Sequence, residues 1–380
     1  MSAEGLAPVD DVALRRERVI TAALRAAFAW SVREQRPDAM YEIAKMTGVV
    51  MEAWGPAGGP ATPMGLVARL HEPLAGLLAF AETADETIDA VRLLEADGLS
   101  PAAQNIACEY VLPLNGETEE RPWMPRWAWM RADRIREQAF RGLNASRDQE
   151  HYVAARRFLI EYAAGTREQI GDALSALPGP PPDPHFIDLP ADRVYLGLDG
   201  SRVWWPCPVC RWPMRVAGGR VSCLYPPHAA RFHLIDSGTP ELRRLGESGS
   251  GALPASHAAE GAVCAEHGVW RFVIVPGCTE LRIAKDVEAL GAQVELWPDR
   301  DAYDLRVTAG STVITADVKE YNSVHRLVQR LREKPARARI LLPRTHEHQR
   351  TVLKSALPAA KAITETQLRA AVRRGTKEGR

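Results

Sequence analysis

Three cysteines and a histidine within one short segment have the types and the spacing of a metal site. Cys207 and Cys210 form a C-x2-C pair with a proline inside it, a tight turn that directs two thiolates at one point. A hairpin pattern around "AGG" then brings Cys223 back toward the pair, and His228 follows shortly after. Three thiolates and an imidazole form a tetrahedral ligand set suited to Zn²⁺. Because four protein ligands leave no position for water, the sequence predicts a structural zinc at these residues.

The sequence leaves the fourth ligand open. His233 lies close by, and "CAEH" offers Cys264 and His267 as a competing pair. Buried free cysteines are the simpler alternative, since thiols are common in protein cores. The coincidence of the pair, the hairpin and the residues that follow it favours metal. We expect the remaining cysteines, Cys108 and Cys278, to be small core residues.

A second group of residues that could take part in chemistry lies in the stretch "ITADVKEY", residues 314–321. A strand alternates its side chains between two faces, so Asp317 and Lys319, two apart, share one face. An Asp–Lys couple of this kind is usually a surface ion pair worth about 0–1 kcal/mol. Its place at the end of an otherwise apolar strand favours a site at one edge of a sheet.

The elements around this couple follow a regular order. "VWRFVIVPG" is an apolar run that ends at a turn, and "TELRIAKDVEALG" predicts a helix capped by Thr279 and ended by Gly291. "QVELWP" predicts a strand, and "AYDLRVTAGSTVITADVKEY" predicts a hairpin. "SVHRLVQRLREKP" reads as a helix stopped by Pro335, "ARILLP" as a strand, and "THEHQRTVLKSAL" as a helix opened by His346 and His348 on the surface. The expected order is helix, strand, strand, strand, helix, strand.

The rest of the chain divides by composition. Apolar residues three and four apart in "RVITAALRAAFAW" and "YVAARRFLIEYAAGTREQIGDALSAL" predict helices, and "PGPPPDP" predicts a stiff, extended linker. The predicted parts are a mainly α-helical domain of unknown role (1–177), a Pro-rich linker and lead-in (178–200), a zinc-ribbon-like module (201–245), an α/β domain (257–360) and a basic C-terminal tail or helix (361–380).

Composition and charge restrict the class of protein. The chain is 46% hydrophobic and 25% charged, as is ordinary for a soluble globular protein, and it has no apolar run long enough for a membrane span. Acids stand in the N-terminal stretch where a signal peptide has a basic leader, so we expect a cytoplasmic protein. Although the net charge is zero, residues 319–380 hold 16 Lys and Arg against 5 Glu. This basic segment suits a polyanionic partner, with a solvated helix surface as the alternative.

The acids and the lysine resemble the PD-(D/E)xK nuclease superfamily, the fold of many restriction endonucleases, over about residues 275–345. Asp304 in the first hairpin strand stands for the first acid, and Asp317 with Lys319 stands for the second half of the motif. Glu280 stands for the accessory acid of the preceding helix. A tyrosine, rather than the proline of the motif, precedes the first acid. The resemblance implies an α/β, C-terminal restriction-endonuclease-like fold, a mixed sheet flanked by helices.

The resemblance also implies metal-dependent cleavage of phosphodiester bonds. Mg²⁺ screens the phosphate and stabilises the leaving oxyanion, and carboxylates hold it while leaving positions for water and substrate. Asp304 and Asp317 would be those ligands, with the carbonyl of Val318 as a third. Lys319 would orient the attacking water and favour its deprotonation. Glu280 would bind the metal through water or complete a second site.

A narrower resemblance covers about residues 200–345. "VWRFVIVPGCTELRIAKDVEALGAQVELWPDRDAYDLRV" with "ADVKEY", downstream of "CPVCRWPM", is similar to the restriction-endonuclease-like component of bacterial pPIWI-RE islands. Those islands pair an Argonaute-like protein with a DinG-type helicase in predicted defence against foreign DNA. The implied partners are therefore DNA, these two proteins and, because cutting two strands favours it, a second copy of the chain.

Three functions remain open from the sequence. The first is a Mg²⁺-dependent DNA endonuclease whose zinc ribbon and basic C-terminal helices grip the backbone. The alternative is a catalytically silent nucleic-acid- or protein-binding adaptor of a defence complex, and a third is a zinc-ribbon transcription regulator. The intact set of Asp304, Asp317 and Lys319 favours the endonuclease, because an adaptor needs no pair of metal-binding carboxylates.

Overall fold

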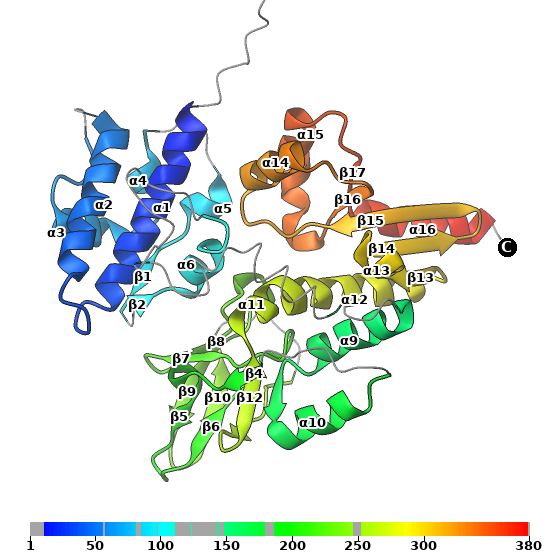
Figure 1. The fold of residues 1–380 in the computed structure, drawn as a ribbon, viewed down its shortest axis with the longest axis horizontal. Coiled ribbons are helices and arrows are strands. Elements are labelled where there is room, and N and C mark those ends of the chain that lie inside the picture. The colour runs from blue at the N-terminus through cyan, green and yellow to red at the C-terminus, as the bar shows by residue number, and fades with distance from the viewer. Residues whose placement is uncertain are drawn as a thin grey trace, which may run out of the picture. The chain divides into compact units, whose positions relative to one another are not determined.

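The computed structural model divides the chain into two compact units, residues 1–132 and 133–380 (Figure 1). Residues 179–185, which include most of the predicted stiff segment "PGPPPDP", lie outside the described residues. The structure describes residues 11–55, 58–80, 85–96, 98–110, 123, 143, 148–178, 186–245 and 252–378.

The first unit is built mainly from helices. Alanines along one side of α1 are buried and let α2 pack closely against it. A buried ion pair between Arg25 of α1 and Glu42 of α2 joins the two helices. Its elements are α1 (Asp11–Ser31), α2 (Ala39–Trp54), α3 (Pro63–Leu70), α4 (Ala75–Leu78), α5 (Glu86–Asp89), α6 (Pro101–Ile106) and the hairpin β1 (Leu94–Glu95) with β2 (Gly98–Leu99).

Two helices from the predicted N-terminal helical domain lie in the second unit. They are α9 (Gln149–Glu161) and α10 (Arg167–Ser175), separated by the short strand β3 (Ala164–Thr166). The apolar face of α9 belongs to the core of the second unit, where it packs against α12 (Val275–Glu288). The domain boundary expected near residue 177 therefore differs from the boundary between the units.

Short antiparallel sheets form the cysteine-bearing part of the second unit. The predicted hairpin is present, and Gly218 and Gly219 at its turn take the positive φ of 53° and 69° that such a two-residue turn requires. The sheets are β10–β9–β8–β7, β11–β6–β5 and β3–β12–β4. Their elements are β4 (Phe186–Asp188), η2 (Ala191–Arg193), β5 (Tyr195–Leu196), β6 (Arg202–Trp204), β7 (Arg215–Ala217), β8 (Arg220–Ser222), η3 (Pro226–His228), β9 (Arg231–Asp236), β10 (Pro240–Arg244), β11 (His257–Ala258) and β12 (Ala262–Ala265).

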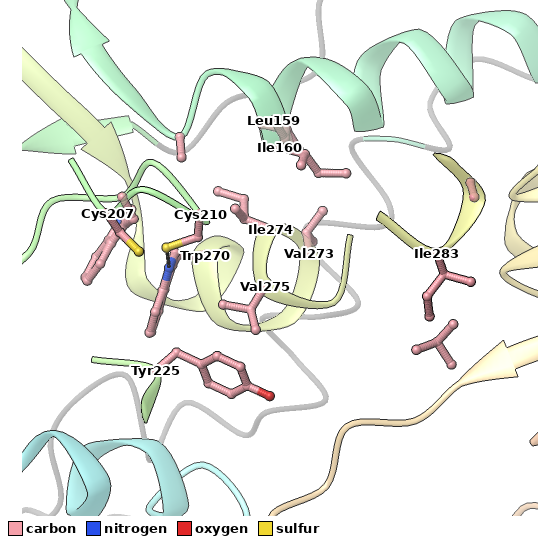
Figure 2. Packing of buried hydrophobic residues seen from close by; sticks show 14 of the residues in the cluster. Leu159, Ile160, Cys207, Cys210, Tyr225, Trp270, Val273, Ile274, Val275 and Ile283 are labelled. Carbon is pink, nitrogen blue, oxygen red and sulfur yellow. Dashed lines mark hydrogen bonds between the residues drawn. The ribbon is translucent and has the colours of Figure 1, made fainter. Parts of the chain in front are cut away.

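A helical segment connects this part to the C-terminal sheet. It consists of α11 (His267–Val269), the π-helical η4 (Trp270–Ile274) and α12. The prediction of an apolar run and turn before a helix capped by Thr279 was wrong, because the run is itself helical and buries its side chains against α9 (Figure 2). The π-turn lies just before Pro276, whose missing N–H removes a helical hydrogen bond.

The C-terminal sheet has five strands in the order β13–β14–β15–β16–β17, the first three antiparallel and the last three parallel. The predicted order of helix, three strands, helix and strand is present, and the mixed α/β class is confirmed. The elements are β13 (Gln293–Leu296), α13 (Pro298–Asp301), β14 (Leu305–Ala309), β15 (Thr312–Val318), α14 (Val324–Glu333), β16 (Arg339–Leu342), η5 (Arg344–Gln349), α15 (Arg350–Ala356), β17 (Ala362–Thr364) and α16 (Glu365–Glu378).

The end of the chain differs from expectation in two respects. Residues 361–380 supply the fifth strand and α16, which packs back against β14 and β17. His346, expected on the surface, is buried in η5, where its ring nitrogen lies 2.8 Å from the Thr345 hydroxyl. The η5 segment that carries it packs against β16, α15 and α16 rather than extending as an exposed helix start.

Candidate metal centre and candidate active site

The three cysteines and His228 come together as a group whose ligand atoms all lie within 4.8 Å of one another. The Nδ1 atom of His228 lies 3.6 Å from the Cys207 sulfur and 3.4 Å from the Cys223 sulfur. The sulfurs of Cys210 and Cys223 are 3.9 Å apart. Ligands about 2.3 Å from a tetrahedral zinc are separated by ~3.8 Å, so the cluster could hold a metal such as zinc.

The C-x2-C turn takes its shape from backbone hydrogen bonds. The amide of Arg211 donates to the carbonyl of Cys207 at 2.8 Å, and Arg211 adopts the left-handed conformation with φ 59°. The amide of Val209 points at the Cys207 sulfur from 3.5 Å. A tight turn of this form places both thiols on its inner side, where they face the returning strand.

Two further N–H groups point at the other sulfurs. The indole of Trp270 donates to Cys210 at 3.2 Å (Figure 2), and the amide of Tyr225 donates to Cys223 at 3.4 Å. Burial raises the pKa of both thiols, so a cation is needed to keep them ionised. N–H donors orient and stabilise thiolate ligands, as the outer contacts of a metal site do.

The competing ligands lie elsewhere. His233 is exposed on β9, Cys264 is buried in β12, and His267 packs edge-on against the stacked rings of Trp212 and Trp270. Among the described residues, the cluster that ends with His228 is the one group of at least three such side chains close enough to share an ion. Cys108 is buried, as expected, and Cys278 is half-buried.

The hairpin brings the two predicted acids of the active site to the same end. Leu305 pairs with Ala316 at the last pair of the register, Asp304 directly precedes Leu305, and Asp317 directly follows Ala316. The amide of Asp304 donates to Ala316 at 3.1 Å, and the amide of Val318 donates to the Asp304 carboxylate at 2.7 Å. Asp317 and Lys319 both act on the charge of Asp304, so the three side chains belong to one region at the end of the hairpin.

Charge and burial act strongly on Asp304. Burial raises the pKa of Asp304 to about 6, and Lys319 is the charge that opposes this rise most. Asp317 raises the pKa of Asp304 further, because like charges disfavour ionisation. Asp317 itself is half-buried and makes no side-chain hydrogen bond or ion pair with any residue that the structure describes. A carboxylate in that state keeps its oxygens available to a ligand.

Glu280 has a different environment from the one expected of an accessory metal ligand. It is buried in α12, and both of its oxygens accept from Arg156, at 3.1 and 2.9 Å. The Trp297 indole donates to the same carboxylate. Burial raises the pKa of Glu280, and the guanidinium opposes that rise. Within the described part of the chain, Glu280, Asp304 and Asp317 do not form a group of three carboxylates close enough to share one ion.

Sequence reasoning missed Arg156, Asp301 and Glu320. Arg156 stands at a core-facing position of α9 and is ion-paired to Asp301 as well as to Glu280. Its one signal in the sequence is an arginine among apolar residues at helical spacing. Glu320 accepts from the Thr279 hydroxyl at 2.9 Å, and burial raises the pKa of Glu320 to about 7.

Two protein-family models match the chain. Residues 277–380 match the model described as "REase associating with pPIWI_RE", and residues 15–166 match "pPIWI_RE three-gene island domain Y". The chain is a restriction-endonuclease-like component of a pPIWI-RE island. The narrower resemblance drawn from the sequence is thus confirmed. No curated protein and no solved structure matches the chain.

The domain Y match of this pPIWI-RE component ends at residue 166, beyond the first unit. It includes α9 and β3, which lie in the second unit with the residues of the REase match. None of the helices that the structure describes combines the length and apolar character needed to cross a membrane.

Proposed function

We propose that this pPIWI-RE component is a Mg²⁺-dependent DNA endonuclease that hydrolyses phosphodiester bonds in defence against foreign DNA. The observation that carries the proposal is that Asp304 and Asp317 stand at the same end of the β14–β15 hairpin, with Asp317 and Lys319 close enough to act on the charge of Asp304. The family description of residues 277–380 supports the same reaction class.

The oxygen donors at this end of the hairpin fit Mg²⁺. One oxygen of Asp304 accepts the Val318 amide, which fixes the carboxylate and leaves its second oxygen for a ligand. Two carboxylates and the nearby carbonyl of Val318 are hard oxygen donors of the kind that Mg²⁺ prefers. When bound, Mg²⁺ supplies positive charge to the phosphate and to the leaving oxygen.

Lys319 completes the proposed chemistry. Its ammonium group donates to the attacking water and to a phosphate oxygen, which orients the nucleophile and offsets developing negative charge. The backbone amide of Lys319 is tied to Leu341 of β16 at 3.0 Å, so the lysine extends from a fixed point of the sheet. Fixed donors of this kind lower the barrier because they need no reorganisation during the reaction.

Glu280 acts in this proposal as a positioning residue rather than a metal ligand. Both of its oxygens are already engaged by Arg156, so binding an ion would require breaking a buried ion pair. The proposed metal ligands are therefore Asp304, Asp317 and Val318, without the accessory acid that the superfamily resemblance implies.

A strip of exposed basic residues supports DNA as the substrate. It consists of Arg332, Lys334, Arg337 and Arg339, at the end of α14 and the start of β16, and we name it the α14 basic strip. The strand β16 lies directly beside β15, which carries Asp317. Positive charge at this position attracts phosphates toward the acids.

Cleavage of circular plasmid and of single-stranded DNA tests the proposal. We expect purified protein with Mg²⁺ or Mn²⁺ to nick DNA, EDTA to stop it, and Asp317→Ala and Lys319→Ala to abolish it. Asp172→Asn on α10 and Lys285→Ala on α12 change exposed residues and should keep the wild-type rate. Metal-dependent cutting that survives Asp317→Ala would place the reaction elsewhere.

The adaptor function is the second candidate, and the pairing of Glu280 with Arg156 favours it, since it removes one acid from the expected set. An adaptor would bind DNA or an island protein without cutting. Binding by the wild type that persists unchanged in Asp317→Ala and Lys319→Ala, with no cleavage under any metal condition, identifies this alternative.

A further inference from the structure

One buried arginine, in the region that matches domain Y, forms ion pairs with two acids in the region that matches the REase model. Arg156, at the centre of α9, is 2% exposed and binds both oxygens of Glu280, 124 residues along the chain. Its other terminal nitrogen donates to Asp301. The guanidinium carbon also lies 4.5 Å from the ring centre of Trp297. A single side chain thus contacts Glu280, on the helix before β13, and also Trp297 and Asp301, in the connection that runs from β13 to Asp304.

That connection has an unusual backbone. Trp297, Asp299, Arg300 and Asp301 have φ values of 48°, 50°, 55° and 75°. Each is a left-handed conformation that an L residue with a side chain rarely adopts, and none of the four is glycine. Consecutive residues of this kind persist only where their surroundings hold them, and such segments cluster at functional sites.

The left-handed turn is joined directly to Asp304. The amide of Trp297 donates to the carbonyl of Asp304 at 2.9 Å, so the start of the turn pairs with a residue three positions beyond its end. Asp304 is therefore held by Trp297 on the β13 side and by Ala316 and Val318 on the β15 side. A change in the turn must move the backbone of Asp304.

Gln149, the first residue of α9, binds the same turn from two directions. Its side-chain NH₂ donates to the carbonyl of Trp297 at 2.9 Å, and its side-chain oxygen accepts from the amide of Arg300 at 2.7 Å. The carbonyl of Trp297 also accepts from the amide of Asp301 within the turn, so Gln149 adds a second donor there and gives the Arg300 amide an acceptor. Gln149 and Arg156 lie two turns apart on one helix, so α9 supports the turn along its length.

The position of α9 is set by close packing against α12. A Cβ atom on Gly277 would lie 2.3 Å from the end of the Ile160 side chain, so glycine allows the two helices to approach. Leu159 and Ile160 lie against the helical segment that carries Val273 and Ile283 (Figure 2). This packing fixes the distance between α9 and α12, which the Arg156 side chain spans to bind Glu280.

We propose that Arg156 and Gln149 are positioning residues, supplied by the domain Y region, that hold the left-handed turn and so fix Asp304 against β15, the strand that carries Asp317. The REase region then carries the acids, and the domain Y region carries the support that aligns them. Its consequence for cleavage rests on the proposed nuclease function, whereas the order of the turn is measurable without it.

Hydrogen exchange of the full-length protein tests the positioning directly. We expect Arg156→Lys and Gln149→Ala to speed amide exchange across residues 297–304 at least tenfold. Exchange in the sheet β7–β10 should stay unchanged. Arg157→Lys and Glu150→Gln alter exposed neighbours on the same helix and should leave every segment at the wild-type rate. Unchanged exchange at residues 297–304 in both Arg156→Lys and Gln149→Ala would overturn the proposal.

Mn²⁺ affinity separates this inference from the nuclease function. Positioning predicts that Gln149→Ala weakens Mn²⁺ binding about tenfold together with the faster exchange, while Asp317→Asn weakens it with exchange unchanged. A wild type that binds no Mn²⁺ and cuts no DNA contradicts the nuclease function, and the exchange result still decides whether α9 orders the turn. Gln149→Ala serves where Arg156→Lys fails to fold, because Gln149 is only half-buried.

Discussion

At the scale of a single residue, a change at Glu280 shows whether this side chain is a positioning residue or a metal ligand. Glu280→Gln keeps the size of the side chain but removes the charge opposite Arg156. Breaking a buried ion pair on one side costs on the order of 3 kcal/mol, so we expect that decrease in the free energy of unfolding measured with urea. Mn²⁺ affinity should change by less than threefold when measured on the folded protein. Loss of Mn²⁺ binding with unchanged stability would make Glu280 a ligand instead.

His346 gives the protein a pH response. Burial lowers the pKa of His346 to about 4, with the positive charges of His348 and Arg271 acting in the same direction. The folded-state pKa is below the unfolded value, so the stabilisation is present above about pH 6.5 and is lost as pH falls toward 4. The full decrease in stability for this shift is about 3 kcal/mol.

The measurement for His346 is the free energy of unfolding from pH 7.5 down to pH 4.5. We expect the wild type to lose more stability over this range than His346→Gln, which has no imidazole to protonate. The exposed His325 on α14 provides the control, and His325→Gln should follow the wild-type curve. Parallel curves for the wild type and His346→Gln would mean that His346 is protonated in the folded protein.

Single residues also show where sequence reasoning stopped. The grouping of Cys207, Cys210, Cys223 and His228 was predictable, because it depends on residue type and short spacing, whereas metal binding by Asp304 and Asp317 stays a prediction. The role of Arg156 was not predictable, since its partner lies 124 residues away and only the fold brings them together. Sequence spacing likewise could not show that Glu280 is already paired.

At the scale of elements, α16 provides a sharp test of packing. A Cβ atom on Gly375 would lie 2.3 Å from the carbonyl oxygen of Ala309 in β14, a backbone group that cannot move aside. We expect Gly375→Ala to lower the free energy of unfolding by about 1–3 kcal/mol or more. Gly171→Ala, in α10 with open space around it, should raise stability by up to about 1 kcal/mol. Equal effects of the two changes in a urea titration would refute this packing of α16.

The cysteine module should depend on its metal. We expect about one zinc per chain by elemental analysis, and loss of the ion together with a lower Tm in Cys207→Ser, because binding energy at a structural site contributes to folding. Cys278→Ser, a half-buried cysteine outside the cluster, should keep both the zinc and the Tm. A metal-free protein with the same Tm as the metal-bound form is the contrary result.

The order of elements could be predicted from periodicity, but the conformation of two segments could not. An apolar run such as "VWRFVIVPG" reads alike for a buried strand or a buried helix, so the part of the helical segment before Thr279 was not predicted. The left-handed turn in "WPDRD" lacks the glycines that normally mark such a conformation, so only the contacts of Gln149 and Arg156 explain it.

At the scale of the whole molecule, a net charge of zero conceals an uneven distribution of positive and negative residues along the chain. The excess of Lys and Arg after residue 318 includes the α14 basic strip. Replacing Arg332, Lys334 and Arg337 by Gln should weaken binding to a short DNA duplex. It should also reduce the slope of log K against log salt by about 0.9 for each phosphate that the protein no longer neutralises. Arg157→Gln and Arg202→Gln, exposed elsewhere, are the controls. An unchanged slope in fluorescence anisotropy would exclude this strip as the DNA surface.

The two family matches also combine at this scale. The domain Y match reaches into the second unit through α9, so the unit that carries the acids is larger than residues 277–380. A description of the unit that carries the acids omits the helix that contacts Glu280 and Asp301 if it stops at the REase match. Variants for activity studies should therefore be made in the full chain.

The most direct test is a crystal structure of the protein soaked with Mn²⁺, with the ion located by its anomalous signal. We expect a peak about 2.2 Å from carboxylate oxygens of both Asp304 and Asp317, a distance typical of small hard cations, and no peak at that place in Asp317→Asn. A peak that contacts neither carboxylate, or none outside the cysteine cluster, would contradict the proposal that these two acids hold the catalytic ion.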